Sequence, residues 1–362
     1  MTKKEVLELA LHGGGPLGRC ADDEPVFVLR AHDKLSTQTV VGWARAAAAD
    51  ARPILRAVSA HALADQPDEA DLAALDLLLR DPVVDVEVAA VEALGRGRVE
   101  SLRTEVLLRA RLGKADVRLA ALAAIGQLGG PDVRDMLTTA LTDSDERFRL
   151  AAVQGLANLK DPASAPLLVS LLRTRSTAGM LPIVRAALLD LGEAAHDEIF
   201  LSMRSPSAEL QRECSLLLAR QSVPAAAPVM MEVLSRNPVD KEVARELAIL
   251  TCTDLRGQVD PPEAWFRWWD GVKHDDSLAW LRAAAEARLI PAPGAEAFEG
   301  AGTRDAIGFL VEVMRLPEQY LAERARRALE DLIGRPVEDL PQHGSQRNAW
   351  LLALLEVLEE QR

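Results

Sequence analysis

A repeat of 31 residues in the middle of the chain constrains the fold more than any other feature. Residues 84–95, 115–126 and 146–157 align column by column. In each segment apolar residues recur at i, i+3, i+4, i+7 and i+8, which is one face of an α-helix. A second helix with the same period precedes each segment. The aligned apolar columns are Val86, Val117 and Phe148; Ala90, Ala121 and Ala152; Leu94, Ile125 and Leu156; and, in the preceding helix, Leu75, Val106 and Leu137.

Each repeat is therefore predicted to be a helical hairpin. A unit of this size cannot bury its apolar face alone, so neighbouring hairpins must stack. Hydrophobic residues make up 49% of the chain but aromatic residues only 4%. Alanine and leucine, both strong helix formers, supply most of the apolar content. The sequence thus predicts an all-α fold, a right-handed α-solenoid of stacked antiparallel hairpins.

Residues 115–133 and 145–172 resemble HEAT repeats of the phycobilisome-lyase type. Repeats of that type read as an acidic residue, then Val-Arg, then spaced alanines that end in Leu-Gly. The resemblance covers about residues 68–175 and fades on both sides. It implies the solenoid fold and leaves the function open, because HEAT arrays serve many roles.

Individual residues carry this resemblance. Arg118 and Arg149 match the arginine of the repeat, and Asp116 and Asp145 lie near its acidic position. Glu87 departs from the pattern, because it stands where the other two copies have arginine.

Three regions are expected along the chain. Residues 1–35 lack the repeat and are predicted to be an N-terminal extension, mostly loop, with one apolar run that docks on the first helices or on a partner. Residues 36–289 are predicted to form the HEAT-like array. A loop rich in proline and glycine then leads to residues 303–362, a predicted helical capping repeat.

Tryptophans gather near the end of the predicted array. Trp265, Trp268 and Trp269 share one helix face, because they are three and four residues apart. They either close the end of the array as a bulky plug or form an exposed aromatic anchor for a partner. A platform for stacking bases is disfavoured by the acidic charge of the chain.

The net charge and the cysteine content limit which binding partners and which cellular compartment are expected. The formal net charge is −13, so nucleic acid is disfavoured, because its binders carry a basic footprint. Cys20, Cys214 and Cys252 are too far apart in sequence for a metal-binding motif, and reduced thiols in the cytoplasm are expected. No secretory signal and no apolar run long enough to cross a membrane is expected.

Sequence motifs for catalysis are not found. The chain has no phosphate-binding Gly-x-x-x-x-Gly-Lys loop. Deoxyhypusine hydroxylases are HEAT proteins that hold iron with His-Glu motifs, but here no histidine precedes glutamate. Aspartate follows His32, His196 and His274, and these three pairs lie in unrelated repeats. We therefore predict no metal, no cofactor and no enzymatic activity.

The candidate binding residues lie on the second helix of each hairpin, which the family resemblance places on the concave side. Arg118 and Arg149 share one column, and Glu92 and Gln154 share another. Arg185 and Arg212 extend the row of arginines into the looser repeats. The alternative is an arginine ladder in which these side chains pair with acidic residues of neighbouring hairpins.

The sequence therefore predicts a protein–protein interaction scaffold or adaptor that binds a partner through the concave face of the array. The partner and the oligomeric state are left open. The alternative is an accessory subunit or enzyme of HEAT-like type that acts on a tetrapyrrole, as a lyase, or on DNA, as a glycosylase. An apolar pocket with convergent polar groups favours the enzyme, and a smooth open groove favours the scaffold.

Overall fold

The computed structural model describes residues 37–173, 179–258, 260–299 and 303–337, together with 341, 346, 347, 349–352 and 354. Within these ranges the chain forms α-helices, short 3-10 helices and turns, and no strand. The predicted extension, residues 1–35, lies outside the described residues. The predicted all-α class of stacked helical hairpins is confirmed.

The chain divides into two compact units, Met1–Leu191 and Gly192–Arg362. The first unit is built from hairpins that follow one another along the sequence. Its α-helices are α3 (Thr37–Ala47), α4 (Pro53–Leu63), α5 (Glu69–Leu78), α6 (Val84–Arg96), α7 (Arg103–Leu112), α8 (Ala115–Leu128), α9 (Val133–Ala140), α10 (Glu146–Leu159), α11 (Ala165–Leu171) and α12 (Leu181–Leu191), with short 3-10 helices η2 (Glu100–Leu102) and η3 (Pro162–Ser164).

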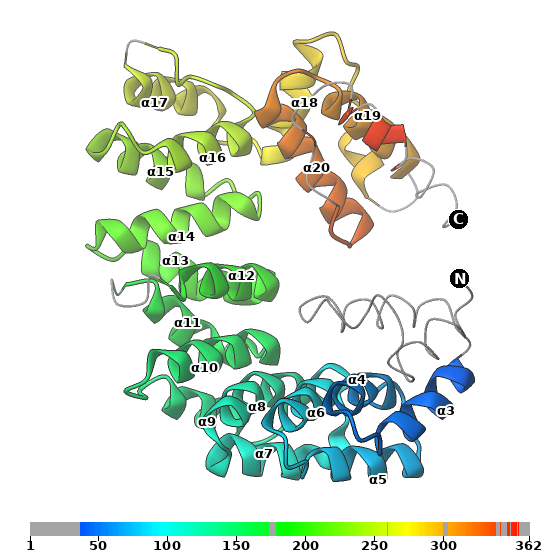
Figure 1. Ribbon diagram of the computed structural model, residues 1–362. Coiled ribbons are helices and arrows are strands. Elements are labelled where there is room, and N and C mark those ends of the chain that lie inside the picture. Colours follow the sequence, from blue (N-terminus) through cyan, green and yellow to red (C-terminus); the bar gives the residue numbers. More distant parts are fainter. Residues whose placement is uncertain are drawn as a thin grey trace. The chain divides into compact units, whose positions relative to one another are not determined.

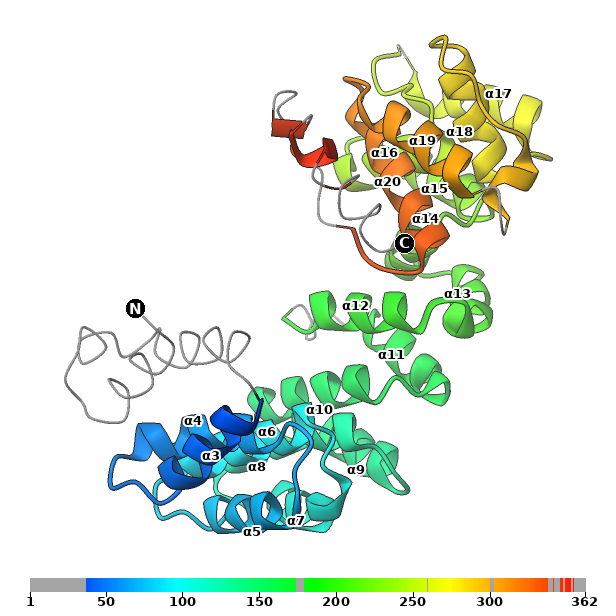
Figure 2. The same cartoon turned by 90° about the vertical axis from the view of Figure 1, so that its right-hand side faces the viewer.

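The hairpins of the first unit form two layers. The second helices α4, α6, α8, α10 and α12 pack side by side in sequence order. The first helices α5, α7 and α9 form the other layer, and both views of the ribbon show α5 and α7 beneath α4, α6 and α8 (Figures 1 and 2). Each hairpin therefore meets its neighbours mainly through its second helix.

The apolar columns of the repeat form the core between these layers. In the first helices, the column of Leu75, Val106 and Leu137 has no exposed surface. In the second helices, the columns that begin at Val86, Ala90 and Leu94 are also buried. The 31-residue period in the sequence is thus a period of packing, and neighbouring hairpins share one continuous core.

Small residues let the second helices approach closely. A Cβ atom added at Gly126 of α8 would lie 2.0 Å from the carbonyl oxygen of Gly155 in α10. One added at Gly155 would lie 2.3 Å from the carbonyl oxygen of Leu122. A Cβ added at Gly95 of α6 would in turn meet Ala124 of α8 at 2.8 Å. The backbones of α6, α8 and α10 therefore pack at a distance that only glycine allows at these positions.

Side-chain caps set the starts of several helices. The Asp145 carboxylate accepts a hydrogen bond from the backbone N–H of Arg147 at the start of α10. At α5, Asp68 and Asp71 accept from each other's backbone N–H groups in a reciprocal capping box. Gly129 ends α8 with a φ of 63°, a conformation that glycine adopts without steric cost.

The second unit is less regular. Its α-helices are α13 (His196–Met203), α14 (Ala208–Arg220), α15 (Ala226–Arg236), α16 (Lys241–Thr251), α17 (Pro261–Val272), α18 (Ser277–Glu286), α19 (Thr303–Met314) and α20 (Gln319–Ile333), with short 3-10 helices η5 (Gly192–Ala195) and η6 (Ala295–Phe298). Helices α13 to α16 still form hairpins, and α14 packs on α16 as second helices do in the first unit.

Helix α20 changes this pattern, because it packs against both α16 and α18. The Arg327 guanidinium of α20 donates to the Glu246 carboxylate of α16 at 2.8 Å, across 81 residues of sequence. Arg324, one turn earlier, donates to the hydroxyl of Ser277 at the start of α18 at 3.0 Å. Polar contacts between distant segments thus hold this end of the second unit together.

Candidate functional site

Arginines at the start of second helices tie each hairpin to the next. Arg56 of α4 donates two hydrogen bonds to the Asp81 carboxylate, at 2.7 and 3.0 Å, in the turn before α6. Arg118 of α8 donates to Asp143 at 3.0 Å, in the turn before α10. In both cases the arginine precedes its partner by 25 residues, so the pairs are equivalent rungs of one ladder.

Of the predicted site residues Arg118 and Arg149, Arg118 belongs to this ladder. The Arg118 guanidinium also lies 4.2 Å from the centre of the Phe148 ring, a cation–π contact. Arg149 donates to the backbone carbonyls of Asp143 and Ser144, at 2.9 and 3.0 Å. Both side chains therefore contact the turn between α9 and α10. Arg118 does so from the preceding hairpin, as in the ladder alternative, and Arg149 from its own hairpin.

Arg212 makes an equivalent rung in the second unit. It donates to Asp240, the N-cap of α16, at 2.6 and 3.1 Å, and to Glu242 and Glu213 at 2.7 Å each. Arg185 is half-buried on α12 in the first unit. The four predicted arginines thus divide between the units, three in the first and one in the second.

One rung of the ladder is replaced. Glu87 of α6 stands where α4 and α8 have arginine, and Leu112 stands where the neighbouring repeats have Asp81 and Asp143. Glu87 instead accepts from Arg109 of α7 at 3.1 Å, and Arg109 also donates to the carbonyl oxygen of Leu79 at 2.6 Å. The ion pair of this repeat therefore lies between α6 and α7 and not in the turn before α8. Leu112, at the position of the missing carboxylate, is 78% exposed.

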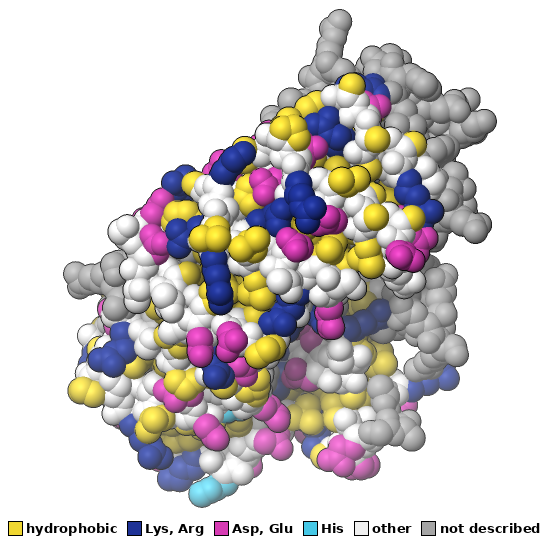
Figure 3. Space-filling view, turned by 90° about the horizontal axis from the view of Figure 1, so that it is seen from below, with side chains coloured by type: hydrophobic (Ala, Val, Ile, Leu, Met, Phe, Trp, Pro, Cys, Tyr) yellow, Lys and Arg dark blue, Asp and Glu magenta, His cyan; other side chains and the backbone are white. Residues whose placement is uncertain are grey.

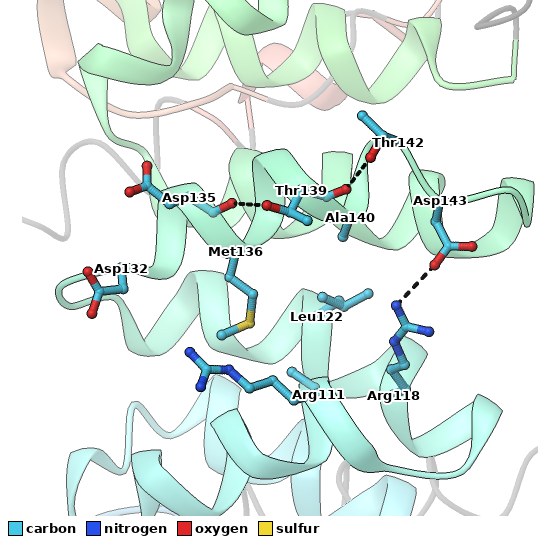
Figure 4. Close-up of a pocket in the computed structure, with 11 residues that line it drawn as sticks. Arg111, Arg118, Leu122, Asp132, Asp135, Met136, Thr139, Ala140, Thr142 and Asp143 are labelled. Carbon is cyan, nitrogen blue, oxygen red and sulfur yellow. Dashed lines mark hydrogen bonds and ion pairs between the residues drawn. The ribbon is translucent and has the colours of Figure 1, made fainter.

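A groove of about 610 Å³ opens between α7 and α9, with α8 at its base. Figure 4 shows Arg118 and Asp143 at one end, Asp132 and Asp135 at the other, and Met136 between them. The hydroxyl of Thr139 donates to the carbonyl oxygen of Asp135 at 2.9 Å, so it satisfies its own helix. The groove brings Arg118 to the surface, while none of the other predicted site residues lines it.

The exposed side of α6, α8 and α10 carries the other predicted residues of the first unit. Glu92 is exposed and Gln154 half-buried, with the Gln154 amide donating to Asn158 at 3.1 Å. One turn away from their column runs an apolar column that the sequence reasoning missed. It consists of Val88, Leu119 and Leu150, 31 residues apart and accessible to solvent.

We call these five residues, Val88, Glu92, Leu119, Leu150 and Gln154, the second-helix face. The signal for its apolar column was present in the sequence, because the column repeats with the same period as the core. It was passed over because an apolar column in a repeat is normally buried.

The opposite side of the first unit has a different character. Leu77 of α5 and Leu108 of α7 are exposed there, also 31 residues apart. In the view from below, hydrophobic side chains are interspersed with basic and acidic ones (Figure 3). Isolated exposed leucines of this kind are common on protein surfaces.

The tryptophans of the second unit form one cluster around α17 and α18. Trp265 has no exposed surface, whereas Trp268 and Trp269 are half-buried. Trp268 packs edge-on against Trp265 and Trp280, with ring centres 5.9 and 5.4 Å apart. Trp265 is thus a core residue, and only Trp268 and Trp269 of the predicted anchor reach the surface.

The described residues give little support for a metal site or for a nucleophilic cysteine. They contain no group of three or more histidine, cysteine, aspartate or glutamate side chains placed to hold a metal ion. His196 is hydrogen-bonded to Gln221 at 2.7 Å, and His32 lies outside the described residues. Burial raises the pKa of both the Cys214 and the Cys252 thiol to about 12. These thiols are therefore protonated at neutral pH and are poor nucleophiles.

The ladder shifts the pKa of its carboxyl groups. Hydrogen bonds from Arg56 lower the pKa of Asp81 below its usual range. The pKa of Asp143 is lowered by the backbone N–H of Asp145 and by Arg118. Both carboxyl groups are therefore charged at neutral pH and available to their arginine partners.

Comparison with known proteins agrees with this geometry. Residues 104–190 match the family model of HEAT repeats, so this part of the first unit consists of HEAT repeats. The narrower resemblance to the phycobilisome-lyase type stays a prediction. No curated protein matches the chain.

Among solved structures, the chain is similar to the crystal structure of an engineered protein, a structural genomics target. The identity is 18% and the TM-score 0.36, over 92% of this chain and 99% of the other. A likeness at this level adds nothing to the assignment of function.

In the part of the chain that the structure describes, no helix combines the length and the apolar character that crossing a bilayer requires.

Proposed function

We propose that the chain is a protein–protein interaction scaffold and that the second-helix face of the first unit binds the partner. The observation that carries the proposal is the solvent-accessible apolar column of Val88 and Leu119, which are half-buried, and Leu150, which is exposed. It crosses three consecutive hairpins and runs beside the column of Glu92 and Gln154. Binding across several repeats is how solenoids commonly engage their partners.

The packing of the first unit supports a concave shape for this face. The second helices approach as closely as glycine permits at Gly126 and Gly155, whereas a groove separates α7 from α9. Closer packing in one layer bends a stack toward that layer. The proposal therefore places the partner on the inner side of the bend.

The predicted arginines take two roles in this proposal. Arg118 joins neighbouring hairpins, and Arg149 bonds to the turn of its own hairpin, so both preserve the shape of the face. Arg185 lies on α12 of the same unit. A cytoplasmic location belongs to the proposal, because both described cysteines are unpaired thiols.

Site-specific photocrosslinking tests the proposal. A photoreactive residue at Leu119 or Leu150 is expected to trap the same protein from native lysate, and Leu119→Glu/Leu150→Glu is expected to abolish its capture. Leu108 of α7, exposed on the other layer, provides the matched control position. Circular dichroism shows whether the double variant remains folded.

Two results would reject the proposal. One is a partner that crosslinks from position 108 and not from 119 or 150. The other is co-purification of a coloured small molecule or nucleic acid without any protein partner, which would favour an accessory subunit or enzyme acting on a tetrapyrrole or on DNA.

A further inference from the structure

The second unit contains a cavity of about 400 Å³ where α16 ends beside α17, α18 and α20. Three aromatic side chains line it: Trp268, Trp280 and Tyr320. Helix α18 contributes only alanines beside Trp280, and their small side chains leave the space open. These alanines are Ala279, Ala283, Ala284 and Ala287. The volume lies within the range of small-molecule sites, roughly 300–1,000 Å³.

Charged groups of both signs line the same cavity. Arg288 is held in place because it donates to Glu318 at 2.8 Å, to the Tyr320 hydroxyl at 3.0 Å and to the carbonyl oxygen of Ala284 at 2.8 Å. A guanidinium has five N–H groups, so two remain beyond these three bonds and can donate to a carboxylate bound in the cavity.

The acidic lining residues are Asp254 and Asp275. Asp254, in the loop after α16, is held by Arg256 through bonds of 2.6 and 2.8 Å. Asp275 lies in the turn between α17 and α18, and its side chain is exposed. Carboxylates accept several hydrogen bonds each, so both can receive an ammonium group.

A buried arginine adds positive charge on the α20 side. Arg324 lies one turn after Tyr320 and is only 3% exposed. It donates to the Ser277 hydroxyl, but its Nε and Nη1 atoms have no hydrogen-bond partner. Arg324 is not among the residues that line the cavity, so the cation that faces a ligand is Arg288.

We propose that this cavity binds a small zwitterion with an apolar, preferably aromatic, body, of the chemical class of the aromatic amino acids. The body packs against Trp268, Trp280 and the alanines of α18. The carboxylate lies toward Arg288 and Tyr320, and the ammonium group toward Asp254 and Asp275. In this arrangement each charged group of the ligand lies toward a lining residue of opposite charge. The site is separate from the second-helix face, so it stands whether or not the scaffold proposal holds.

Tryptophan fluorescence of the full chain tests this proposal, because Trp268 and Trp280 line the cavity. The probes are L-phenylalanine, phenethylamine, which lacks the carboxylate, and 3-phenylpropionate, which lacks the ammonium group. L-phenylalanine is expected to change the emission saturably, and each singly charged probe to bind about tenfold more weakly. Equal binding of all three probes, or no saturable response to L-phenylalanine, would overturn the proposal.

Two substitutions locate the site. Ala284→Leu fills the cavity and is expected to weaken L-phenylalanine binding by about tenfold or more. Ala225→Leu, at an exposed alanine outside the cavity, should leave binding unchanged. Arg288→Gln should remove the preference for L-phenylalanine over phenethylamine. Thermal melts of each variant confirm that it is folded, and unchanged binding to a folded Ala284→Leu variant would contradict the proposal.

Discussion

The two units use the same hairpin but stabilise it differently. In the first unit, α6, α8 and α10 pack through glycine and alanine, and an arginine ladder repeats from hairpin to hairpin. In the second, α20 packs on both α16 and α18, and ion pairs join residues as far apart as Glu246 and Arg327. Regular packing leaves a long repeating surface, whereas irregular packing leaves a cavity that is open to solvent. The regular unit is thus suited to an extended partner and the irregular one to a small ligand.

The largest expected effect concerns the close helix packing of the first unit. Gly126→Ala should lower the free energy of unfolding by about 3 kcal/mol, because the new methyl group meets the Gly155 backbone, which cannot move aside easily. Urea unfolding measures the loss. Gly42→Ala is the matched control, because no atom lies within 4 Å of its added Cβ. The control should gain about 0.5–1 kcal/mol; equal effects at both sites would show that close packing is not required.

Loss of a rung should be more costly in the second unit than in the first. Arg212→Ala leaves the buried carboxylates of Asp240 and Glu213 without this guanidinium, and should cost about 2 kcal/mol after allowance for partial exposure. Arg118→Ala should cost less, because Arg118 pairs with one carboxylate. Arg315→Ala removes an exposed pair with Glu312 and should change stability by less than about 0.5 kcal/mol. Equal losses in all three variants would reject the ladder as a stabilising feature.

The arginine–aspartate pair that is replaced at α6 can be restored by substitution. Glu87→Arg alone should destabilise the first unit, because it places a second cation near Arg109. Adding Leu112→Asp supplies the missing carboxylate, and the double variant should recover part of the loss. A double-mutant cycle is expected to give a coupling energy of about 0.5–1 kcal/mol. Strict additivity would mean that these positions are not equivalent to Arg118 and Asp143.

A pH dependence is also expected of the first unit. Burial, with a contribution from Arg96, lowers the pKa of His61 to about 4 from 6.5. The unfolded chain therefore binds a proton at higher pH than the folded chain, and stability should fall as the pH drops from about 6.5 to about 4. Thermal melts of His61→Gln should show a flatter profile over this interval. An unchanged slope would place the pH dependence elsewhere.

Much of the first unit could be predicted because the 31-residue period of its sequence is also the period of its helix packing. The columns that begin at Val86, Ala90 and Leu94 identify the buried side of each second helix. The role of Arg118 was harder to predict. Its partner Asp143 lies in another hairpin, so the same arginine was compatible with a ladder and with a binding groove.

The second unit shows where local patterns stop being informative. Helical spacing placed Trp265, Trp268 and Trp269 on one face, yet only Trp265 has no exposed surface and Trp268 lines a cavity. That difference depends on how α18 and α20 pack beside α17. Contacts such as Arg324 with Ser277, 47 residues apart, carry no periodic signal.

Hydroxyl-radical footprinting of the full chain, alone and with its crosslinked partner, tests the central claim most directly. The claim is that the regular unit binds through its second helices. The account predicts that the partner reduces oxidation of Leu119 and Leu150, while Leu108 and Leu112 are oxidised equally in both samples. Protection of Leu108 and Leu112 with Leu119 and Leu150 unchanged would contradict it.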